Sequence, residues 1–169
     1  GAPAKPLVSV GDEVLVGQKI GEASGFISAN VICSVSGKVT KIENRRVANG
    51  SMVNSIIVQN DGEYRTIPNF GKDRDASKLS KQEIRDIIKE AGIVGLGGAG
   101  FPTHVKLTPK DENAIDYVIV NGAECEPYLT SDYRMMIEEP EKIVGGLKII
   151  LQLFDKAKGV IAVENNKPE

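Results

Sequence analysis

The sequence predicts a small all-β domain followed by an α/β domain with a mostly parallel sheet. Short apolar runs separated by Gly, Asp and Asn fill residues 7–59, a pattern typical of a small sandwich or barrel. Two short and nearly continuous apolar runs, 115–120 and 160–163, are typical of strands covered on both faces. Helical sequence separates these runs and a glycine-rich loop precedes them, which together indicate α/β architecture.

The composition excludes several classes of protein. The chain has 169 residues, of which 41% are hydrophobic and 26% charged, as in globular domains. Its net charge of −2, without a basic block, gives no electrostatic footprint for nucleic acid. No apolar run reaches the roughly 18 to 20 residues of a membrane span, so we expect no transmembrane segment. Cys33 and Cys125 lie far apart, with no C-x-x-C pair, so we expect no disulfide framework, and a cytosolic location is the default.

The first domain contains two patterns, V-x-x-G-D-x-V-x-x-G-Q-x-I and S-V-S-G-K-V-T-K-I. Together they resemble the barrel-sandwich hybrid of biotinyl and lipoyl carrier domains, which present a modifiable lysine at a hairpin tip. The equivalent stretch here, 24–30, contains no lysine, so a scaffold barrel is favoured over a covalent swinging arm. We expect this domain over residues 1–67 and a polar linker over 68–78.

Three helices are expected after the linker. Ser80 is placed as an N-cap with Glu83 at the spacing of a capping box, and Gly92 ends that helix. A short helix is expected over 131–138, and a longer one, opened by Pro140, over 140–155. The first helix has its apolar residues on one face: Leu79, Ile84, Ile87 and Ile88.

The most unusual stretch is the glycine-rich loop, residues 95–106, which has four glycines within six residues. It is not a P-loop, because Lys106 is not adjacent to the last glycine, and it lacks the G-x-G-x-x-G spacing. Glycines of this kind serve either a ligand or a packing turn, and both alternatives stay open. Phe101 is either a core residue or a stacking platform for an aromatic ring. His104, the single histidine, lacks partners at metal-ligand spacing, so it is expected to form hydrogen bonds near a ligand.

A second loop, N-G-A-E-C-E-P at 121–127, directly follows the first apolar run, where open α/β sheets place their ligands. Asn121 offers an amide donor and acceptor. Glu124 and Glu126 could accept from ribose hydroxyls or remain hydrated. For Cys125 a packed thiol is favoured over a reactive one. We expect the two loops to form one ligand site.

The segments G-L-G-G-A-G-F-P-T-H-V-K-L and N-G-A-E-C-E-P-Y-L-T-S-D-Y-R closely resemble RnfC, a component of the Rnf complex, the membrane-bound ferredoxin:NAD oxidoreductase. The resemblance covers essentially the whole chain. The same loops are similar, more distantly, to the flavin-carrying, NADH-oxidising subunit of respiratory complex I. The resemblance implies a Rossmann-like FMN/NADH-binding domain, and we expect residues 79–169 to be its first part, in a fragment of a longer protein.

The resemblance also implies which residues bind the cofactors. Phe101 would stack on the dinucleotide, and none of the residues is expected to be catalytic by itself. Three positions depart from the complex I pattern: Leu96 replaces an arginine, Ala123 replaces an aspartate, and Leu107 replaces an aromatic residue. The other residues expected to line the FMN/NAD(H) pocket are Gly95, Gly97, Gly98, Gly100, Lys106, Asn121, Glu124 and Glu126.

The implied activity is hydride exchange between NAD(H) and FMN, with electrons passing to or from iron–sulfur clusters and driving ion translocation. The implied partners are other subunits of a membrane redox complex and, indirectly, ferredoxin, with the chain peripheral on the cytoplasmic face of the membrane. The family carries its cluster cysteines and a further glycine-containing loop beyond residue 169. We therefore expect no metal site in these residues and no complete reaction from them alone. The alternatives are a corrinoid (cobalamin) reductase-type relative and a non-catalytic docking module.

Overall fold

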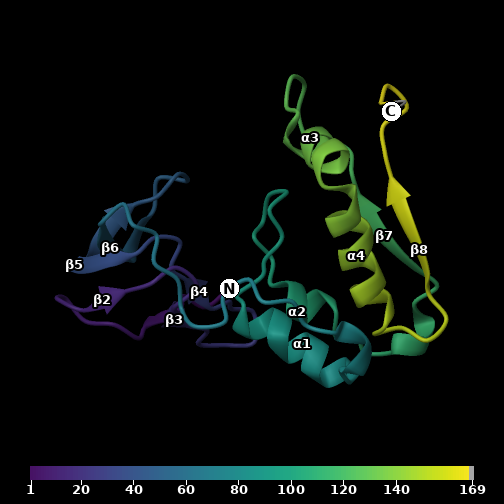
Figure 1. Ribbon diagram of the computed structural model, residues 1–169. Helices are drawn as coiled ribbons and strands as arrows, with labels where there is room; N and C mark the ends of the chain where they lie inside the picture. Colours follow the sequence, from purple (N-terminus) through teal and green to yellow (C-terminus); the bar gives the residue numbers. More distant parts are fainter. Residues whose placement is uncertain (168–169) are drawn as a thin grey trace. The chain divides into compact units, whose positions relative to one another are not determined.

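The structure, a computed structural model, describes residues 1–167 (Figure 1). Its internal contacts divide the chain into two compact units. The first comprises Gly1–Arg74, Ile87–Gly95 and Phe101–Thr103, and the second comprises Asp75–Asp86, Leu96–Gly100 and the residues from His104 onward. The domain boundaries expected at residues 67 and 79 stay a prediction.

The first unit contains two antiparallel sheets of three strands each (Figure 1). The longest strands, β5 and β6, pair along their whole length, with a register shift between Val39 and Lys41. An all-β domain in this part of the chain is thus confirmed. One sheet has the order β1 (Lys5–Pro6), β3 (Lys19–Glu22), β4 (Val31–Ile32), and the other has the order β2 (Glu13–Val14), β5 (Gly37–Arg46), β6 (Met52–Asn60).

The core of this unit follows from the apolar positions of the short strands. Val14 and Val39 are fully buried, and Ile20 and Cys33 are nearly so. The Cys33 thiol donates to the carbonyl of Val35 at 3.1 Å, so this cysteine behaves as a small core residue. Alternating strand residues therefore form the core, as the period-2 pattern requires.

A polar network ties the end of β6 to the start of β5. The hydroxyl of Ser36, which is fully buried, donates to Asp61 Oδ1 at 2.6 Å and accepts from the Arg65 backbone N–H at 2.9 Å. The Arg65 guanidinium donates to Asp61 Oδ2 at 2.8 Å. These contacts, the Arg65 hydrogen bond foremost and the Ser36 hydroxyl next, lower the pKa of Asp61 to about 2.

We expect this network to make the stability of the barrel depend on acid pH. An unfolded aspartate has a pKa of about 3.9, above the folded value of about 2. The contribution of Asp61 is therefore present above about pH 4 and is lost as the pH falls toward 2. Asp61→Asn should lower stability at pH 7 and flatten its decline over that window, measured by urea unfolding at a series of pH values. Asp73→Asn, at an exposed position, is the charge-matched control, and an unchanged slope for Asp61→Asn would contradict the prediction.

The second unit contains a pair of parallel strands with two helices between them in sequence. β7 (Tyr117–Asn121) and β8 (Lys158–Ala162) run in register from the pair Tyr117 and Lys158 to the pair Asn121 and Ala162. α3 (Ser131–Glu138) is followed by α4 (Pro140–Leu151), which lies along the strand pair (Figure 1). The expected strand–helix–strand order is confirmed.

Two details of the second unit differ from expectation. α4 ends at Leu151, before the expected residue 155, because Leu153 and Phe154 leave the helix and are buried in the core. The strands are not covered on both faces: Tyr117 and Ile119 are 58% and 62% exposed. A two-stranded parallel pair does not establish a Rossmann-like sheet, which stays a prediction.

α1 (Lys81–Glu90) begins and ends as its sequence predicts. The Ser80 backbone N–H donates to Glu83 Oε2 at 2.8 Å, and the Glu83 N–H donates to Ser80 Oγ at 3.3 Å, which is a capping box. The hydrogen bond from the Ser80 backbone also lowers the pKa of Glu83. Gly92 follows the helix with φ of +65°, as expected for a residue at C′.

The remaining helices are short. They are η1 (Ala76–Lys78), α2 (Thr103–Lys106) and η2 (Glu112–Ala114). The buried side chain of Arg85 donates from Nε to the carbonyl of Leu107 at 2.9 Å and pairs with Glu112. This contact fixes the segment that follows α2. Over the described residues, no helix is long and apolar enough to cross a membrane.

Candidate cofactor site

The glycine-rich loop projects from a short antiparallel base. Val94 bridges Pro102, the Gly95 N–H donates to the Phe101 carbonyl at 2.9 Å, and the Thr103 N–H donates to the Ile93 carbonyl at 3.0 Å. These bonds fix both ends of the loop. Its tip, residues 96–100, is exposed, and the Leu96 side chain is 93% exposed.

The glycines at the tip are not explained by packing within the chain. A Cβ added at Gly97, Gly98 or Gly100 would meet no other atom within 4 Å. Gly98 and Gly100 have φ of +141° and +61°, which favour glycine for conformational reasons. Gly97 has neither a positive φ nor a close neighbour. Its missing side chain therefore favours the ligand interpretation of the loop over the packing interpretation.

The residues that follow the tip are also accessible. Phe101 is 38% exposed, so it is not a core residue and its ring is available for stacking. His104 and Lys106 lie on α2, with His104 half-buried and Lys106 exposed. An exposed ammonium group beside a glycine-rich loop is suited to an anionic group such as a phosphate.

The second loop begins as a continuation of the parallel sheet. The Gly122 N–H donates to the Ala162 carbonyl at 2.8 Å. A Cβ at Gly122 would lie 2.7 Å from Met136 Sδ, so packing requires this glycine. Asn121 Oδ1 accepts from the Ala123 N–H at 3.2 Å, which closes the first turn of the loop and orients the amide of Asn121 at the end of β7.

Glu124 binds the N-terminus of α3. Its Oε1 accepts from the backbone N–H groups of Asp132 and Tyr133 at 2.8 and 2.9 Å. The N-cap residue itself, Thr130, makes no side-chain capping bond. The half-buried carboxylate of Glu124 therefore satisfies N–H groups that a helix start leaves without partners, and its charge is favourable there. Glu126, by contrast, is exposed.

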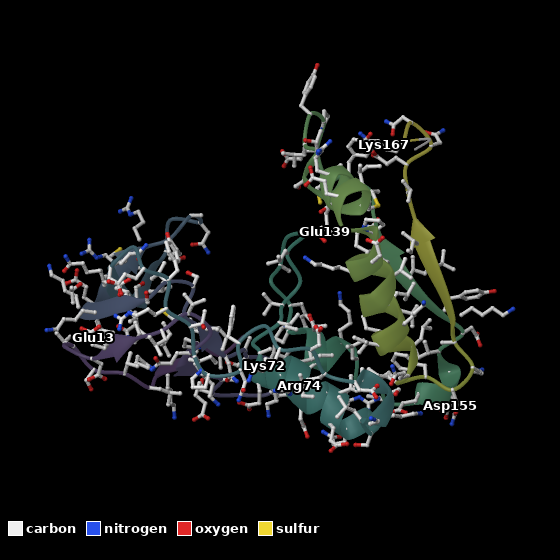
Figure 2. All side chains as sticks on the ribbon, in the orientation of Figure 1. Glu13, Lys72, Arg74, Glu139, Asp155 and Lys167 are labelled. Carbon is white, nitrogen blue, oxygen red and sulfur yellow. The ribbon has the colours of Figure 1, made fainter. Side chains whose placement is uncertain are left out.

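A polar cavity of about 340 Å³ lies at the carboxyl end of the β7–β8 pair. Loops after neighbouring parallel strands meet at this edge, the position where α/β sheets bind ligands. Lys167, labelled in Figure 2, lines the cavity, and its Nζ lies 4.7 Å from the centre of the Tyr133 ring. The other lining residues are Glu124, Cys125, Glu126, Pro127, Tyr128, Leu129, Glu164 and Asn166.

Three cavity residues that follow β8 were not among the residues predicted from the sequence: Glu164, Asn166 and Lys167. Their signal was available, because they directly follow the apolar run 160–163 just as Asn121 follows the run before it. The structure brings Glu124 and Glu126 together with them. The cavity lining includes none of residues 95–106, so a single site formed by both loops stays a prediction.

Cys125 is exposed and lines the cavity, so the expectation of a packed thiol is wrong. Burial decreases along the loop, from buried Gly122 through half-buried Glu124 to exposed Cys125. The cause is the path of the chain, which leaves the packed edge of the sheet after Gly122. Cys33 and Cys125 are both free cysteines.

An apolar cavity of about 250 Å³ lies between α3, α4 and β8. The Tyr133 ring and the Lys167 side chain line it, so it begins where those two residues meet. In Figure 2, Lys167 is labelled near the end of the chain. The remaining lining residues are apolar: Met136, Ile137, Pro140, Ile143, Val144, Ile161 and Val163.

These features equip the chain to bind a ligand with sugar and phosphate groups. Carboxylates in a loop accept from sugar hydroxyls, while a lysine and backbone N–H groups donate to phosphates. Over the residues that the structure describes, no group of three His, Cys, Asp or Glu side chains could hold a metal ion.

Two family models match the chain. Residues 1–63 match the RnfC barrel sandwich hybrid domain, and residues 88–169 match the Nuo51 FMN-binding domain. The second match contains both the glycine-rich loop and the polar cavity.

Curated relatives extend this similarity over the whole chain, and each of them is the C component of an oxidoreductase complex. Those of the proton-translocating ferredoxin:NAD(+) oxidoreductase of Clostridium ljungdahlii and the Na(+)-translocating ferredoxin:NAD(+) oxidoreductase of Acetobacterium woodii are each 44% identical over 169 residues. That of the ion-translocating oxidoreductase of Rhodobacter capsulatus is 39% identical over 171 residues. The chain is covered completely in each case but spans only 37%, 38% and 33% of these relatives. The chain therefore has an RnfC-type barrel sandwich hybrid domain followed by a Nuo51-type FMN-binding domain, and its whole length is similar to part of the C subunits of these complexes.

Proposed function

We propose that this chain is the cofactor-binding part of an RnfC subunit that binds FMN and exchanges a hydride with NAD(H). Electrons would pass between the flavin and iron–sulfur clusters held elsewhere in the subunit. The observation that carries the proposal is the open tip of the glycine-rich loop, inside a segment that matches an FMN-binding domain. Bound FMN supplies the hydride and single-electron chemistry.

The residues of the loop fit a flavin mononucleotide. The missing Cβ atoms of Gly97 and Gly98 leave space for close approach to the backbone. The exposed ammonium of Lys106 would neutralise part of the phosphate charge. Phe101 presents part of its ring to the surface and would stack on the dinucleotide, because aromatic faces pack well in offset arrangements.

The polar cavity fits the sugar and amide groups of a nicotinamide dinucleotide. The exposed carboxylate of Glu126 would accept hydrogen bonds from ribose hydroxyls. The Asn121 amide, oriented by its bond from Ala123, would donate to the flavin ring edge or a ribose. We place Asn166 and Lys167 beside Glu126, as neutral and cationic groups on the same cavity.

We further propose that the subunit works in a membrane redox complex, peripheral on the cytoplasmic face. The support is the names of the relatives, which are subunits of ion-translocating complexes. Relatives named for protons and for Na⁺ are equally identical to this chain. We therefore place the choice of coupling ion outside these residues, and ferredoxin would exchange electrons with other parts of the complex.

A titration of the full-length subunit with FMN tests the proposal. Flavin fluorescence should be quenched on binding, and NADH should then bleach the bound flavin. A flavin that is neither quenched nor bleached would refute the proposal and favour the docking-module alternative.

Lys106→Gln should weaken binding of FMN by about tenfold, corresponding to about 1.4 kcal/mol, because a charge-assisted contact to the phosphate is lost. Riboflavin lacks the phosphate, so its affinity should not change. The control is Lys110→Gln, which removes an exposed lysine four residues away. Equal losses for FMN and riboflavin would show that Lys106 does not act on the phosphate.

A further inference from the structure

The two strands β3 and β4 lie next to the C-terminal turn of α1 within the first compact unit. The Asn30 side chain, only 7% exposed, forms the main contact. Its Nδ2 donates to the carbonyls of Lys89 and Glu90 at 3.2 and 3.3 Å, and its Oδ1 accepts from the Ala23 N–H at 2.9 Å. One buried amide thus joins the barrel, strands β1–β6, to two carbonyls in the last turn of α1, where the helix supplies no N–H four residues further on.

Two further contacts support the same junction. A Cβ at Gly92 would lie 2.4 Å from the backbone oxygen of Asn30, so the two backbones approach as closely as only glycine permits. The Lys19 ammonium pairs with Glu90 at 2.8 Å. The hydrogen bond that Lys19 donates to the Glu90 carboxylate raises the pKa of Lys19.

The junction is directly connected to the base of the glycine-rich loop. The carbonyl of Lys89 also accepts from the Gly92 N–H at 3.0 Å. The Ile93 N–H donates to the Ile88 carbonyl at 3.3 Å, and the Ile93 carbonyl accepts from Thr103 at 3.0 Å. A displacement of the last turn of α1 would therefore be transmitted, through Gly92 and Ile93, to the base from which residues 96–100 project.

We infer that the barrel positions the glycine-rich loop, and that Asn30 is the positioning residue through which it acts. The boundary between the two family matches, 1–63 and 88–169, does not separate two independent bodies at this point, because Asn30 and residues 89–92 belong to one compact unit. The barrel therefore supports the cofactor loop, in addition to any surface that it offers to partners. Its effect on a bound flavin rests on the function proposed above.

Asn30→Asp separates the bonds that Asn30 donates to α1 from the bond that it accepts within the barrel. The carboxylate can still accept from the Ala23 N–H, but it cannot donate to the helix carbonyls and faces their oxygen atoms. Ser28→Ala is the matched control, because Ser28 is equally buried (5% exposed) and bonds only within the barrel, to Ser24 and Ala2. Glu90→Gln weakens the ion pair between Lys19 and Glu90. The substituted residue lies on the exposed side of α1, so no residue of the barrel is changed.

Hydrogen exchange of the full-length protein without added ligand is the primary measurement. Asn30→Asp should speed exchange of the Ile93, Gly95 and Thr103 amides by about tenfold, and Glu90→Gln should do so by a smaller factor. Ser28→Ala should leave these amides unchanged. Equal effects of Asn30→Asp and Ser28→Ala on the loop base, or an unfolded barrel in Asn30→Asp with no change in Glu90→Gln, would overturn the inference.

The second measurement is the visible circular dichroism spectrum of bound FMN. This spectrum reports the geometry of the loop around the flavin, and a loss of protein stability alone would not change it. Asn30→Asp should change this spectrum and weaken FMN binding about threefold to tenfold, with Ser28→Ala indistinguishable from wild type. An identical spectrum in Asn30→Asp would contradict positioning. If the wild-type protein binds no FMN, the proposed function fails, while the exchange comparison still decides whether Asn30 positions the loop.

Discussion

Gly97→Val is expected to weaken FMN binding by about tenfold to a hundredfold while leaving the stability of the protein nearly unchanged. A Cβ at this position meets nothing within 4 Å, and its φ lies outside the positive range. The chain by itself therefore tolerates a side chain there. A bound flavin in close contact with the loop would not, because inserting methyl groups into a packed contact costs about 1–3 kcal/mol, equivalent to roughly tenfold to a hundredfold in affinity.

A graded series makes this test decisive. Gly97→Ala should show a smaller loss of affinity than Gly97→Val, with unfolding free energy equal to or slightly above wild type, since a compatible Gly→Ala change stabilises by about 0.4–1 kcal/mol. Gly146→Ala is the matched control: it also adds a Cβ into open space, on α4. Flavin fluorescence titration and urea unfolding report the two quantities. Unaltered FMN affinity in Gly97→Val would return the loop to the packing interpretation.

The parts of the fold that were predicted correctly are those set by local sequence. The capping box of Ser80 and Glu83 and the C′ position of Gly92 each depend on neighbours within four residues. The alternation of apolar residues in the barrel likewise determines which side chains form its core. Local hydrogen bonds and period-2 burial are visible in a single sequence because the partners lie near one another along the chain.

The features that were missed depend on contacts between distant residues. Asn30 bonds to carbonyls 59 and 60 residues away. In the sequence around it, Asn30 is recognisable only as a polar residue in a β-hairpin. The exposure of Cys125 follows from the point at which the chain leaves the sheet. The cavity residues after β8 become neighbours of the second loop only through the parallel pairing of β7 and β8. No periodicity encodes such pairings.

The two carboxylates of the second loop show the same limit. From sequence, Glu124 and Glu126 were equivalent candidates for cofactor binding. In the structure Glu124 accepts from two N–H groups at the start of α3, the nearer of them eight residues along the chain, whereas Glu126 is exposed on the cavity. We propose that Glu124 orders the loop and that Glu126 contacts the dinucleotide.

Glu124→Ala is accordingly expected to destabilise the second unit by about 1–2 kcal/mol, the usual range for the loss of a helix cap, and to weaken NADH binding indirectly through disorder of the loop. Glu126→Gln should leave stability unchanged, within about 0.5 kcal/mol as for most surface substitutions, and weaken NADH binding directly. Urea unfolding and titration of the flavin-loaded, full-length subunit with NADH provide the two measurements.

A second-site rescue distinguishes capping from direct ligand contact at Glu124. Thr130 occupies the N-cap position without a side-chain capping bond, and aspartate is among the preferred residues there. Thr130→Asp in the Glu124→Ala background should therefore recover most of the lost stability. If Glu124 acts by ordering the loop, NADH affinity should recover with stability in the double variant. Recovered stability without recovered affinity would instead place the Glu124 carboxylate on the ligand, because the new aspartate restores the helix start but returns no charge to the loop.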